Sequence, residues 1–244
     1  MDSKDKRIAL VTGANKGIGF EIARQLGQAG VTVLLAARDS VLGQAAVSML
    51  RTEGLDVHSI QLNVTDPNTV ENAAQWIRAR HERLDILVNN AGIGDGADGP
   101  PSIGSVEAAR KMLETNFLGV LTVTQSMLPL LRKASSASIV NMSSSLGSLG
   151  GNADPKSTYY GARLTGYNAS KAALNMLTVQ LAQELRDTQI IVNSVCPGFV
   201  KTDLNGNTGH LSATEAAALP VRLALLRHDR FTGRFMSTEG EVAW

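Results

Sequence analysis

The sequence predicts an α/β fold in which a doubly wound parallel sheet of about seven strands carries helices on both faces. Short apolar runs typical of buried strands alternate with longer segments of helical spacing along the 244 residues. The first apolar run, residues 8–11, leads through a glycine-rich turn into a helical pattern. Because neither an internal repeat nor a linker-like segment interrupts this alternation, we expect a single domain over residues 1–244.

The individual elements follow from apolar spacing and from start and stop signals. Asp66 and Pro67 form a helix cap followed by a proline suited to the first turn, and Gly54 is a good helix terminator. The expected strands are residues 8–11, 32–36, 57–62, 84–88, 138–142, 190–195 and 231–237. The expected helices begin near residue 17 and then cover residues 40–53, 67–81, 106–132, 167–186 and 213–226. The glycine- and proline-rich residues 93–104 and residues 204–212 are expected to form loops.

Composition and charge exclude several classes of function. The net charge of +1 and the scattered Lys and Arg residues argue against a nucleic-acid-binding surface. No apolar run approaches the ~20 residues of a membrane span, and residues 1–6 do not resemble a signal peptide. The one cysteine, Cys196, cannot form an internal disulfide and fits a reducing compartment. We therefore expect a cytoplasmic protein that binds neither nucleic acid nor a membrane.

The glycine-rich turn lies within residues 10–19, LVTGANKGIG. Gly13 can adopt backbone angles that other residues disfavour, while Gly17 and Gly19 let a pyrophosphate and the first strand approach closely. The helix that begins near Gly17 presents its free N–H groups and positive dipole end to such an anion. The alternative is an ordinary surface turn, but the strand before it and the helix after it favour a Rossmann-type dinucleotide site.

Ligands of such sheets bind beyond the carboxyl ends of the strands. Polar residues fall at several of these ends, namely Asn63, Asn90, Ser143 to Ser145 and Thr202. Tyr167 and Lys171 lie nearby in sequence, and their spacing of four places both on one helical face with Cβ atoms ~6 Å apart. An ammonium group beside a phenol lowers a pKa that starts near ~10, so this tyrosine could exchange a proton at neutral pH. By itself such a pair is weak evidence, because most are surface residues.

Several motifs occur in a characteristic order. They are Thr12-Gly13-Ala14-Asn15-Lys16-Gly17-Ile18-Gly19, Asn89-Asn90-Ala91-Gly92, Asn116, the serines 143–145, Tyr167-x-x-x-Lys171 and Pro197-Gly198. Together they resemble the short-chain dehydrogenase/reductase family over nearly the whole chain. Asn15-Lys16, the run from Cys196 to Thr202 and Trp244 resemble the carbonyl reductase branch of that family. The resemblance implies an NADPH-dependent reductase of small aldehydes or ketones.

The resemblance also implies catalytic roles for four residues. Tyr167 would donate a proton to the substrate carbonyl, and Lys171 would hold the nicotinamide ribose and lower the pKa of the tyrosine. Ser144 stands three residues before Gly147, as the catalytic serine of the family does, and its hydroxyl would donate to the carbonyl oxygen. Asn116 matches an asparagine that completes a proton relay through water. Its alternative role is that of a helix-interior residue bonded to backbone, and the two roles can coexist.

The implied cofactor is NADPH or NADP+, which supplies the hydride, so no metal is expected. The implied contacts are Gly13, Asn15, Lys16, Gly17, Ile18, Gly19, Arg38, Asn63, Val64, Asn90, Ala91, Gly92, Tyr167, Lys171, Pro197, Gly198, Val200 and Thr202. NAD-specific proteins of this fold hold the adenosine ribose with a carboxylate after the second strand. Here Ala37 and Arg38 follow that strand, and Lys16 could reach the same region, which favours a 2′-phosphate. The neighbouring Asp39 weakens this positive field.

Residues 148–166 are interpreted as an insertion before the catalytic helix, shorter than the one generally found in carbonyl reductases. The insertion contains Tyr159 and Tyr160 as alternatives to Tyr167, but Arg163 is too basic to be a tunable neighbour for Tyr159. Many family members associate through the helices expected here at 106–132 and 167–186. In the carbonyl reductase branch the insertion covers these helices, so the resemblance favours a monomer over a homo-oligomer, and the polar residues of 148–166 suit a surface that faces water. An insertion that only borders the substrate pocket would leave the helices free.

Two other functions remain open from the sequence. One is an alcohol dehydrogenase that works mainly in the oxidising direction on a narrow terpenoid or steroid alcohol. The other is a non-catalytic dinucleotide sensor, which the joint presence of Ser144, Tyr167 and Lys171 disfavours. Cys196 is expected to be a small apolar residue beside the cofactor. The histidines have no metal-ligand spacing and are expected on the surface or in loops: His58, His81, His210 and His228.

Overall fold

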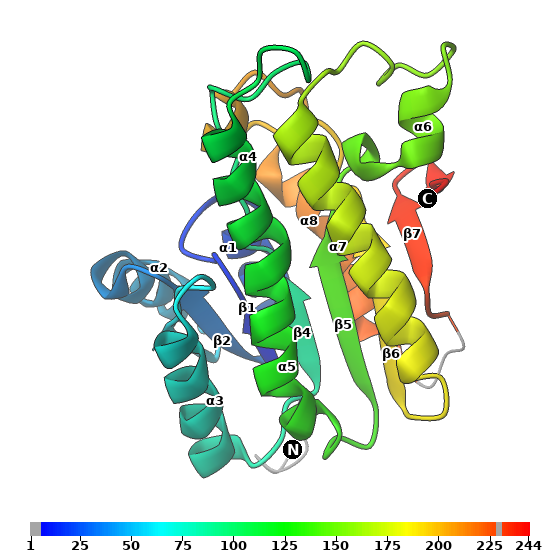
Figure 1. Cartoon of the computed structure of the whole chain (residues 1–244). Helices are drawn as coiled ribbons and strands as arrows, with labels where there is room; N and C mark the ends of the chain where they lie inside the picture. Colours follow the sequence, from blue (N-terminus) through cyan, green and yellow to red (C-terminus); the bar gives the residue numbers. More distant parts are fainter. Residues whose placement is uncertain (1–5, 228–230) are drawn as a thin grey trace.

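The computed structural model describes residues 6–227 and 231–244, and these contain one eight-stranded sheet (Figure 1). The strands are β1 (Ile8–Val11), β2 (Thr32–Ala37), β3 (Val57–Gln61), β4 (Ile86–Asn89), β5 (Ala137–Met142), β6 (Ile190–Val195), β7 (Arg234–Ser237) and β8 (Gly240–Glu241). Their order is β3-β2-β1-β4-β5-β6-β7-β8. All neighbours pair in parallel except β7 and β8. The chain turns from one half of the sheet to the other between β1 and β4, which is where ligands bind in such folds.

Helices cover both faces of this sheet. They are α1 (Gly17–Gln28), α2 (Ser40–Thr52), α3 (Pro67–His81), α4 (Val106–Leu113), α5 (Gly119–Leu131), α6 (Leu149–Ala153), α7 (Thr165–Glu184) and α8 (Ala213–Leu225). Helices α3, α5 and α7 share one apolar core with the sheet, and α1, α2 and α8 share a second core on the opposite face (Figure 1). The predicted doubly wound α/β fold is therefore confirmed. The antiparallel strand β8 brings the sheet to eight strands.

Four segments differ in detail from the sequence prediction. The helix expected over residues 106–132 is divided by the π-helix η1 (Glu114–Leu118), at whose end the Gly119 N–H bonds to the carbonyl oxygen of Glu114. Such a turn accommodates one extra residue and is frequent at functional sites. Short helices also occur in the insertion (α6) and in the loop after β6, where η3 spans Asp203–Asn205. The last predicted strand begins three residues later, at Arg234.

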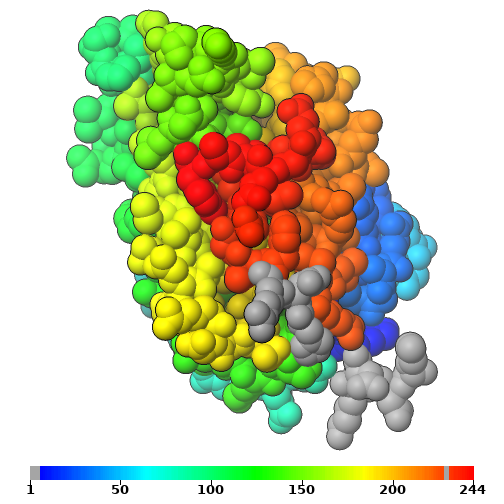
Figure 2. Space-filling view, turned by 90° about the vertical axis from the view of Figure 1, so that its right-hand side faces the viewer, coloured from blue at the N-terminus to red at the C-terminus, as the bar shows by residue number. Residues whose placement is uncertain are grey.

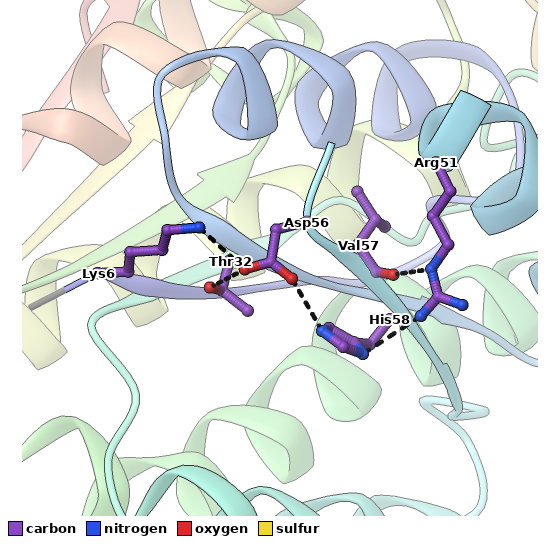
Figure 3. Close-up of polar contacts among 6 residues, drawn as sticks. All are labelled: Lys6, Thr32, Arg51, Asp56, Val57 and His58. Atoms are coloured by element: carbon purple, nitrogen blue, oxygen red, sulfur yellow. Dashed lines mark hydrogen bonds and ion pairs between the residues drawn. The ribbon is translucent and has the colours of Figure 1, made fainter. Parts of the chain in front are cut away.

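A polar network joins the amino-terminal ends of the strands, at the edge opposite the switch point (Figure 3). The Asp56 carboxylate accepts from Thr32 Oγ1 at 2.8 Å and from Lys6 Nζ at 3.4 Å, and it bonds His58 Nε2 at 3.0 Å. Burial alone raises the pKa of Asp56, but the bonds from Thr32, His58 and Lys6 together lower it. His58 also contacts Arg51. His58 is thus a half-exposed strand residue with two polar partners.

The carboxyl-terminal residues lie against the insertion. The Gly150 N–H donates to the Trp244 carbonyl oxygen at 3.1 Å, and the Trp244 ring stacks on Phe235 with centroids 5.6 Å apart. Figure 2 shows the red carboxyl-terminal residues next to the green residues of this region. The insertion therefore packs at the β7 side of the sheet, beside the carboxyl terminus.

None of the helices within residues 6–227 and 231–244 combines the length and apolar character that crossing a membrane requires.

Candidate active site

The glycine-rich turn is held in place by the end of β4. Gly13 has a φ of +62°, and a Cβ atom on it would lie 2.9 Å from Ala91 Cα. The Asn90 side-chain amide donates to the carbonyl oxygens of Thr12 and Gly13 at 2.9 and 3.1 Å. The Thr12 hydroxyl oxygen accepts from the N–H groups of Asn90 and Ala91, both at 3.0 Å. Four hydrogen bonds thus join the glycine-rich turn to the residues after β4, which are far apart from it in sequence.

The start of α1 fits a phosphate group. The N-cap residue Lys16 makes no side-chain capping bond, and the first turn carries no acidic residue. A Cβ atom added to Gly17, whose φ is +59°, would find only Thr202 Cγ2 within 4 Å, at 3.9 Å. Free N–H groups at an open helix start attract anions. These features fit the pyrophosphate of a dinucleotide, held by residues 17–19 with Thr202 facing them from the loop after β6.

The region after β2 carries an exposed cation. Arg38 is exposed and forms no ion pair within the described part of the chain, whereas Ala37 is buried. The Asp39 carboxylate accepts from two N–H groups, of Val41 at 2.9 Å and Leu42 at 3.0 Å, and so caps α2. The charge expected to weaken the positive field is therefore engaged by a helix N-terminus.

Lys16 forms an exposed ion pair that sequence reasoning did not find. Its ammonium group bonds the carboxylate of Asp203 in η3, and this bond lowers the pKa of Asp203. Nothing in the local pattern marks Asp203 as a partner, because 187 positions separate the two residues. The pair connects the glycine-rich turn with the loop after β6.

The remaining predicted cofactor residues surround the same strand ends. Asn15 and Ile18 are half-buried on the glycine-rich turn, and Asn63 accepts from the N–H and hydroxyl of Thr65 after β3. Val64 packs against Gly119, where a Cβ atom would meet its Cγ2 at 2.9 Å. After β6 come Pro197, Gly198 with a φ of +86°, the buried Val200 and Thr202.

The three serines after β5 have different partners. The Ser143 hydroxyl donates to Asn175 Oδ1 at 2.6 Å, and the Ser145 hydroxyl contacts Cys196 Sγ at 3.1 Å. Both serines are buried, whereas Ser144 is half-buried and its hydroxyl bonds the Tyr167 side chain. Of the three serines, Ser144 is therefore the one whose hydroxyl contacts the Tyr167 phenol.

Tyr167 and Lys171 lie together as their spacing predicts, but their pKa values differ from expectation. Burial raises the pKa of Tyr167 to about 12, Cys196 adds to this rise, and the Ser144 bond opposes it. Burial lowers the pKa of Lys171 to about 8. Lys171 Nζ lies 5.6 Å from the centroid of the tyrosine ring and donates to the Met142 carbonyl oxygen at 2.8 Å. The pKa of Tyr167 is thus raised, not lowered as its spacing from Lys171 suggested, and desolvation is the largest cause.

Asn116 lies in η1 and is fully buried. Its Oδ1 accepts from the Ile93 N–H at 2.8 Å, and its Nδ2 donates to the Ile93 carbonyl oxygen at 2.9 Å and to Ser170 Oγ at 3.0 Å. This is the backbone-bonded role that the sequence left as the alternative. A Cβ atom on Gly92 would lie 3.3 Å from Asn116 Oδ1 and 3.5 Å from Lys171 Nζ. The backbone of Gly92 therefore lies between the side chains of Asn116 and Lys171, two of the predicted catalytic residues.

Sequence reasoning also missed Asp98, in a segment expected to be only an exposed loop. Its two carboxylate oxygens accept from the N–H groups of Gly166 and Tyr167, both at 2.9 Å. The bonds span 68 and 69 positions, so no local signal could have revealed them. The described residues contain no group of three or more His, Cys, Asp or Glu side chains arranged to hold a metal ion, and His228 lies outside them.

Fold and site together define an α/β protein of the dinucleotide-binding type, with serine, tyrosine and lysine side chains gathered beyond the carboxyl ends of β4, β5 and β6. A family model described as short chain dehydrogenase matches residues 7–212. The chain therefore belongs to the short-chain dehydrogenase/reductase family of oxidoreductases.

Named relatives are similar over nearly their whole length. Short-chain dehydrogenase/reductase 1 of Saponaria officinalis is 38% identical, with 97% of this chain and 95% of that protein covered. The (+)-neomenthol dehydrogenase of Arabidopsis thaliana is 35% identical, with 93% and 94% covered. The solved structure of NADPH-bound carbonyl reductase from chicken fatty liver has a TM-score of 0.85 and 31% identity, with 98% and 99% covered. The Saponaria alignment spans 292 residues, more than the 244 of this chain, because that relative has segments that this chain lacks.

Proposed function

We propose that this protein is an NADP(H)-dependent oxidoreductase that reduces the carbonyl group of small aldehydes or ketones, with Tyr167 as the proton donor. The observation that carries the proposal is that the buried Lys171 Nζ lies 5.6 Å from the centroid of the Tyr167 ring, while the Ser144 hydroxyl interacts with the same phenol. This group stands beside the glycine-rich turn, at the edge where ligands of such sheets bind.

The proton chemistry follows from burial. With a pKa of about 12, Tyr167 is protonated at neutral pH and can donate its proton to a carbonyl oxygen as that oxygen gains negative charge. The Ser144 hydroxyl is a second donor to the same oxygen. Lys171 stabilises the developing phenolate while its ammonium form persists, below a pH of about 8. The bound dinucleotide supplies the hydride.

The charges after β2 support a preference for NADPH. Arg38 is exposed where NAD-specific proteins of this fold carry a carboxylate, and Asp39 is engaged as the cap of α2. Lys16 supplies a second cation on the glycine-rich turn, although it forms an ion pair with Asp203. The similarity to a carbonyl reductase solved with NADPH bound points the same way.

A second candidate is oxidation of an alcohol by the same residues in reverse. The similarity to a (+)-neomenthol dehydrogenase favours a cyclic terpenoid alcohol as the substrate class in that case. Both candidates transfer the proton through Tyr167. They differ in the preferred direction of the reaction, carbonyl reduction or alcohol oxidation.

Steady-state kinetics of the purified protein test the proposal. We expect NADPH consumption with some members of a panel of aldehydes and ketones, and a higher kcat/KM with NADPH than with NADH. The charge-reversed variant Arg38→Asp should lower the preference by at least about tenfold, because it loses a cation facing the 2′-phosphate and gains an acceptor for a ribose hydroxyl. A wild-type protein that prefers NADH would contradict the cofactor assignment, and dinucleotide binding without turnover in either direction would support a sensor.

A further inference from the structure

The helix that carries Tyr167 cannot cap its own first turn. The N-cap position of α7 is Leu164, whose side chain has no hydrogen-bond acceptor, and the first turn contains no acidic residue. The first N–H groups of a helix have no partner inside that helix. Tyr167 is the third residue of α7, so its own N–H belongs to this group.

The loop over residues 93–104 supplies the missing acceptors. The Thr165 N–H donates to the Gly99 carbonyl oxygen at 3.1 Å. The Gly166 N–H donates to Asp98 Oδ1 and the Tyr167 N–H to Asp98 Oδ2, both at 2.9 Å. The next N–H, that of Asn168, makes the first bond within the helix, to the Leu164 carbonyl oxygen at 2.8 Å. Every N–H group of the first turn is thus satisfied, and Asp98 accounts for two of them.

The loop is bonded to η1 at its first residue and is closed on itself by internal hydrogen bonds. Ile93 is bonded to the Asn116 side chain through both its N–H and its carbonyl group. The Asp98 N–H donates to the Asp95 carbonyl oxygen at 3.0 Å, and the Ser105 N–H donates to the Ala97 carbonyl oxygen at 3.0 Å. Because the loop is itself held in place, the Asp98 carboxylate can restrain the first turn of α7 and does not simply move with it.

Packing leaves the first turn of α7 little room to move while it is capped. A Cβ atom added to Gly166 would lie 2.7 Å from Ala109 Cα and 2.6 Å from Met112 Cε, so α4 contacts this turn closely. Across the helix, the Tyr167 side chain bonds Ser144. A frayed first turn would move the phenol relative to Ser144, and a misplacement of about 1 Å can cost ~10² in rate.

We infer that Asp98 is a positioning residue for Tyr167: by capping α7 from the loop after β4, its carboxylate holds the phenol in the geometry for proton transfer. The inference rests on the proposed function, since it assigns Asp98 a part in the same proton transfer. Asp98 acts through the backbone of Tyr167 and touches no reacting atom.

The experiment compares Asp98→Ala with Asp98→Asn and with the matched control Asp95→Ala. Asp95 lies in the same loop, and among the described residues its Oδ1 accepts from the Ala97 N–H, at 2.9 Å, and from no group of α7. In Asp98→Ala, we expect kcat to fall by about tenfold or more, while the KM values for carbonyl and NADPH stay within about threefold. Asp98→Asn keeps one acceptor oxygen, so its kcat should lie between those of Asp98→Ala and the wild type. The kcat of Asp95→Ala should be close to that of the wild type.

Two further readouts separate positioning from a general loss of structure. Amide hydrogen exchange at Gly166 and Tyr167 should accelerate at least about fivefold in Asp98→Ala and not in Asp95→Ala. In a double-mutant cycle, Asp98→Ala should lower the rate little further once Tyr167→Phe has removed the proton donor.

The inference would be overturned if Asp98→Ala lowered the rate by the same factor in the wild type and in Tyr167→Phe. It would also be overturned if Asp98→Ala left hydrogen exchange at the Gly166 and Tyr167 amides unchanged. If the wild type reduces carbonyls and Asp98→Ala keeps the same kcat, the role of Asp98 fails alone. If the wild type reduces none of the panel, the proposed function fails and the inference falls with it.

Discussion

Ser144 differs from the serines on either side of it in its contacts and in being half-buried, which makes it a test at the scale of single residues. Ser143 and Ser145 are engaged by Asn175 and Cys196, whereas Ser144 bonds Tyr167. We expect Ser144→Ala to slow turnover by at least about tenfold, because one donor to the carbonyl oxygen is lost. Ser143→Ala and Ser145→Ala should have smaller effects. Single-turnover rates compare the three variants without interference from product release.

Tyr167→Phe should cut kcat by at least ~10²-fold while the fold and dinucleotide binding persist, because the proton donor alone is removed. The matched control is Tyr160→Phe, since Tyr160 is a half-exposed residue of the insertion. Circular dichroism and cofactor fluorescence titration check the fold and the binding. Greater damage from Tyr160→Phe would contradict the assignment of the proton donor.

Titration of the site predicts a pH profile for carbonyl reduction. Tyr167, with a pKa of about 12, keeps its proton throughout the neutral range, whereas Lys171 loses its charge as the pH rises through about 8. We therefore expect kcat/KM to be level below that pH and to fall above it, because neutral lysine no longer stabilises the phenolate. In Lys171→Arg, where the charge persists, the alkaline limb should move to higher pH, whatever the absolute rate. A profile that stays level to pH 10 would contradict this role of Lys171.

At the scale of secondary-structure elements, the close approach of α7 to the segment after β5 depends on one glycine. Gly147 ends the 3-10 helix η2 (Ser145–Gly147), and a Cβ atom there would lie 2.7 Å from both the carbonyl carbon and the Cβ atom of Lys171. Gly147→Ala should lower the free energy of unfolding by about 1–3 kcal/mol and reduce kcat, because α7 must shift. Gly161→Ala is the matched control, since no atom lies within 4 Å of a Cβ there. Urea denaturation and steady-state rates measure both effects; equal effects of the two variants would contradict the steric argument.

At the scale of the whole molecule, the sequence favours a monomer on the condition that the insertion covers the long helices. The structure instead places α6 beside η2 and the carboxyl-terminal Trp244. Within the insertion, Asn152 Oδ1 and the Ala162 carbonyl oxygen accept from Asn168 Nδ2, so the insertion reaches the first turn of α7. Within the described residues, the exposed large apolar side chains on α4, η1, α5 and α7 are Val106, Leu118 and Met176.

A monomer stays our prediction, because three separate apolar side chains offer little of the apolar core that a stable interface needs. Light scattering behind a sizing column should give a mass near the 25.8 kDa of one chain. The variant Met176→Glu should leave that mass unchanged. A mass of twice or four times this value, reduced by Met176→Glu, would instead place an interface on α7.

The sequence by itself determined the features that depend on neighbours along the chain. Apolar periodicity predicted the parallel strands and their covering helices, because burial of one helical face or of a whole strand leaves a pattern of fixed period. The glycine-rich turn and the spacing of Tyr167 and Lys171 were visible for the same reason. The π-helix around Asn116 was not predicted, since its one extra residue leaves the apolar pattern of the helix nearly intact.

Only the tertiary structure decided which distant groups meet. The capping of α7 by Asp98 and the ion pair of Lys16 with Asp203 join residues separated by 69 and 187 positions. The raised pKa of Tyr167 likewise depends on burial by several elements, and the local Tyr-Lys pair alone suggested the opposite direction. Hydrogen bonds and desolvation act through space, so a pattern along the chain can name the reacting residues but not the surroundings that set their geometry and charge.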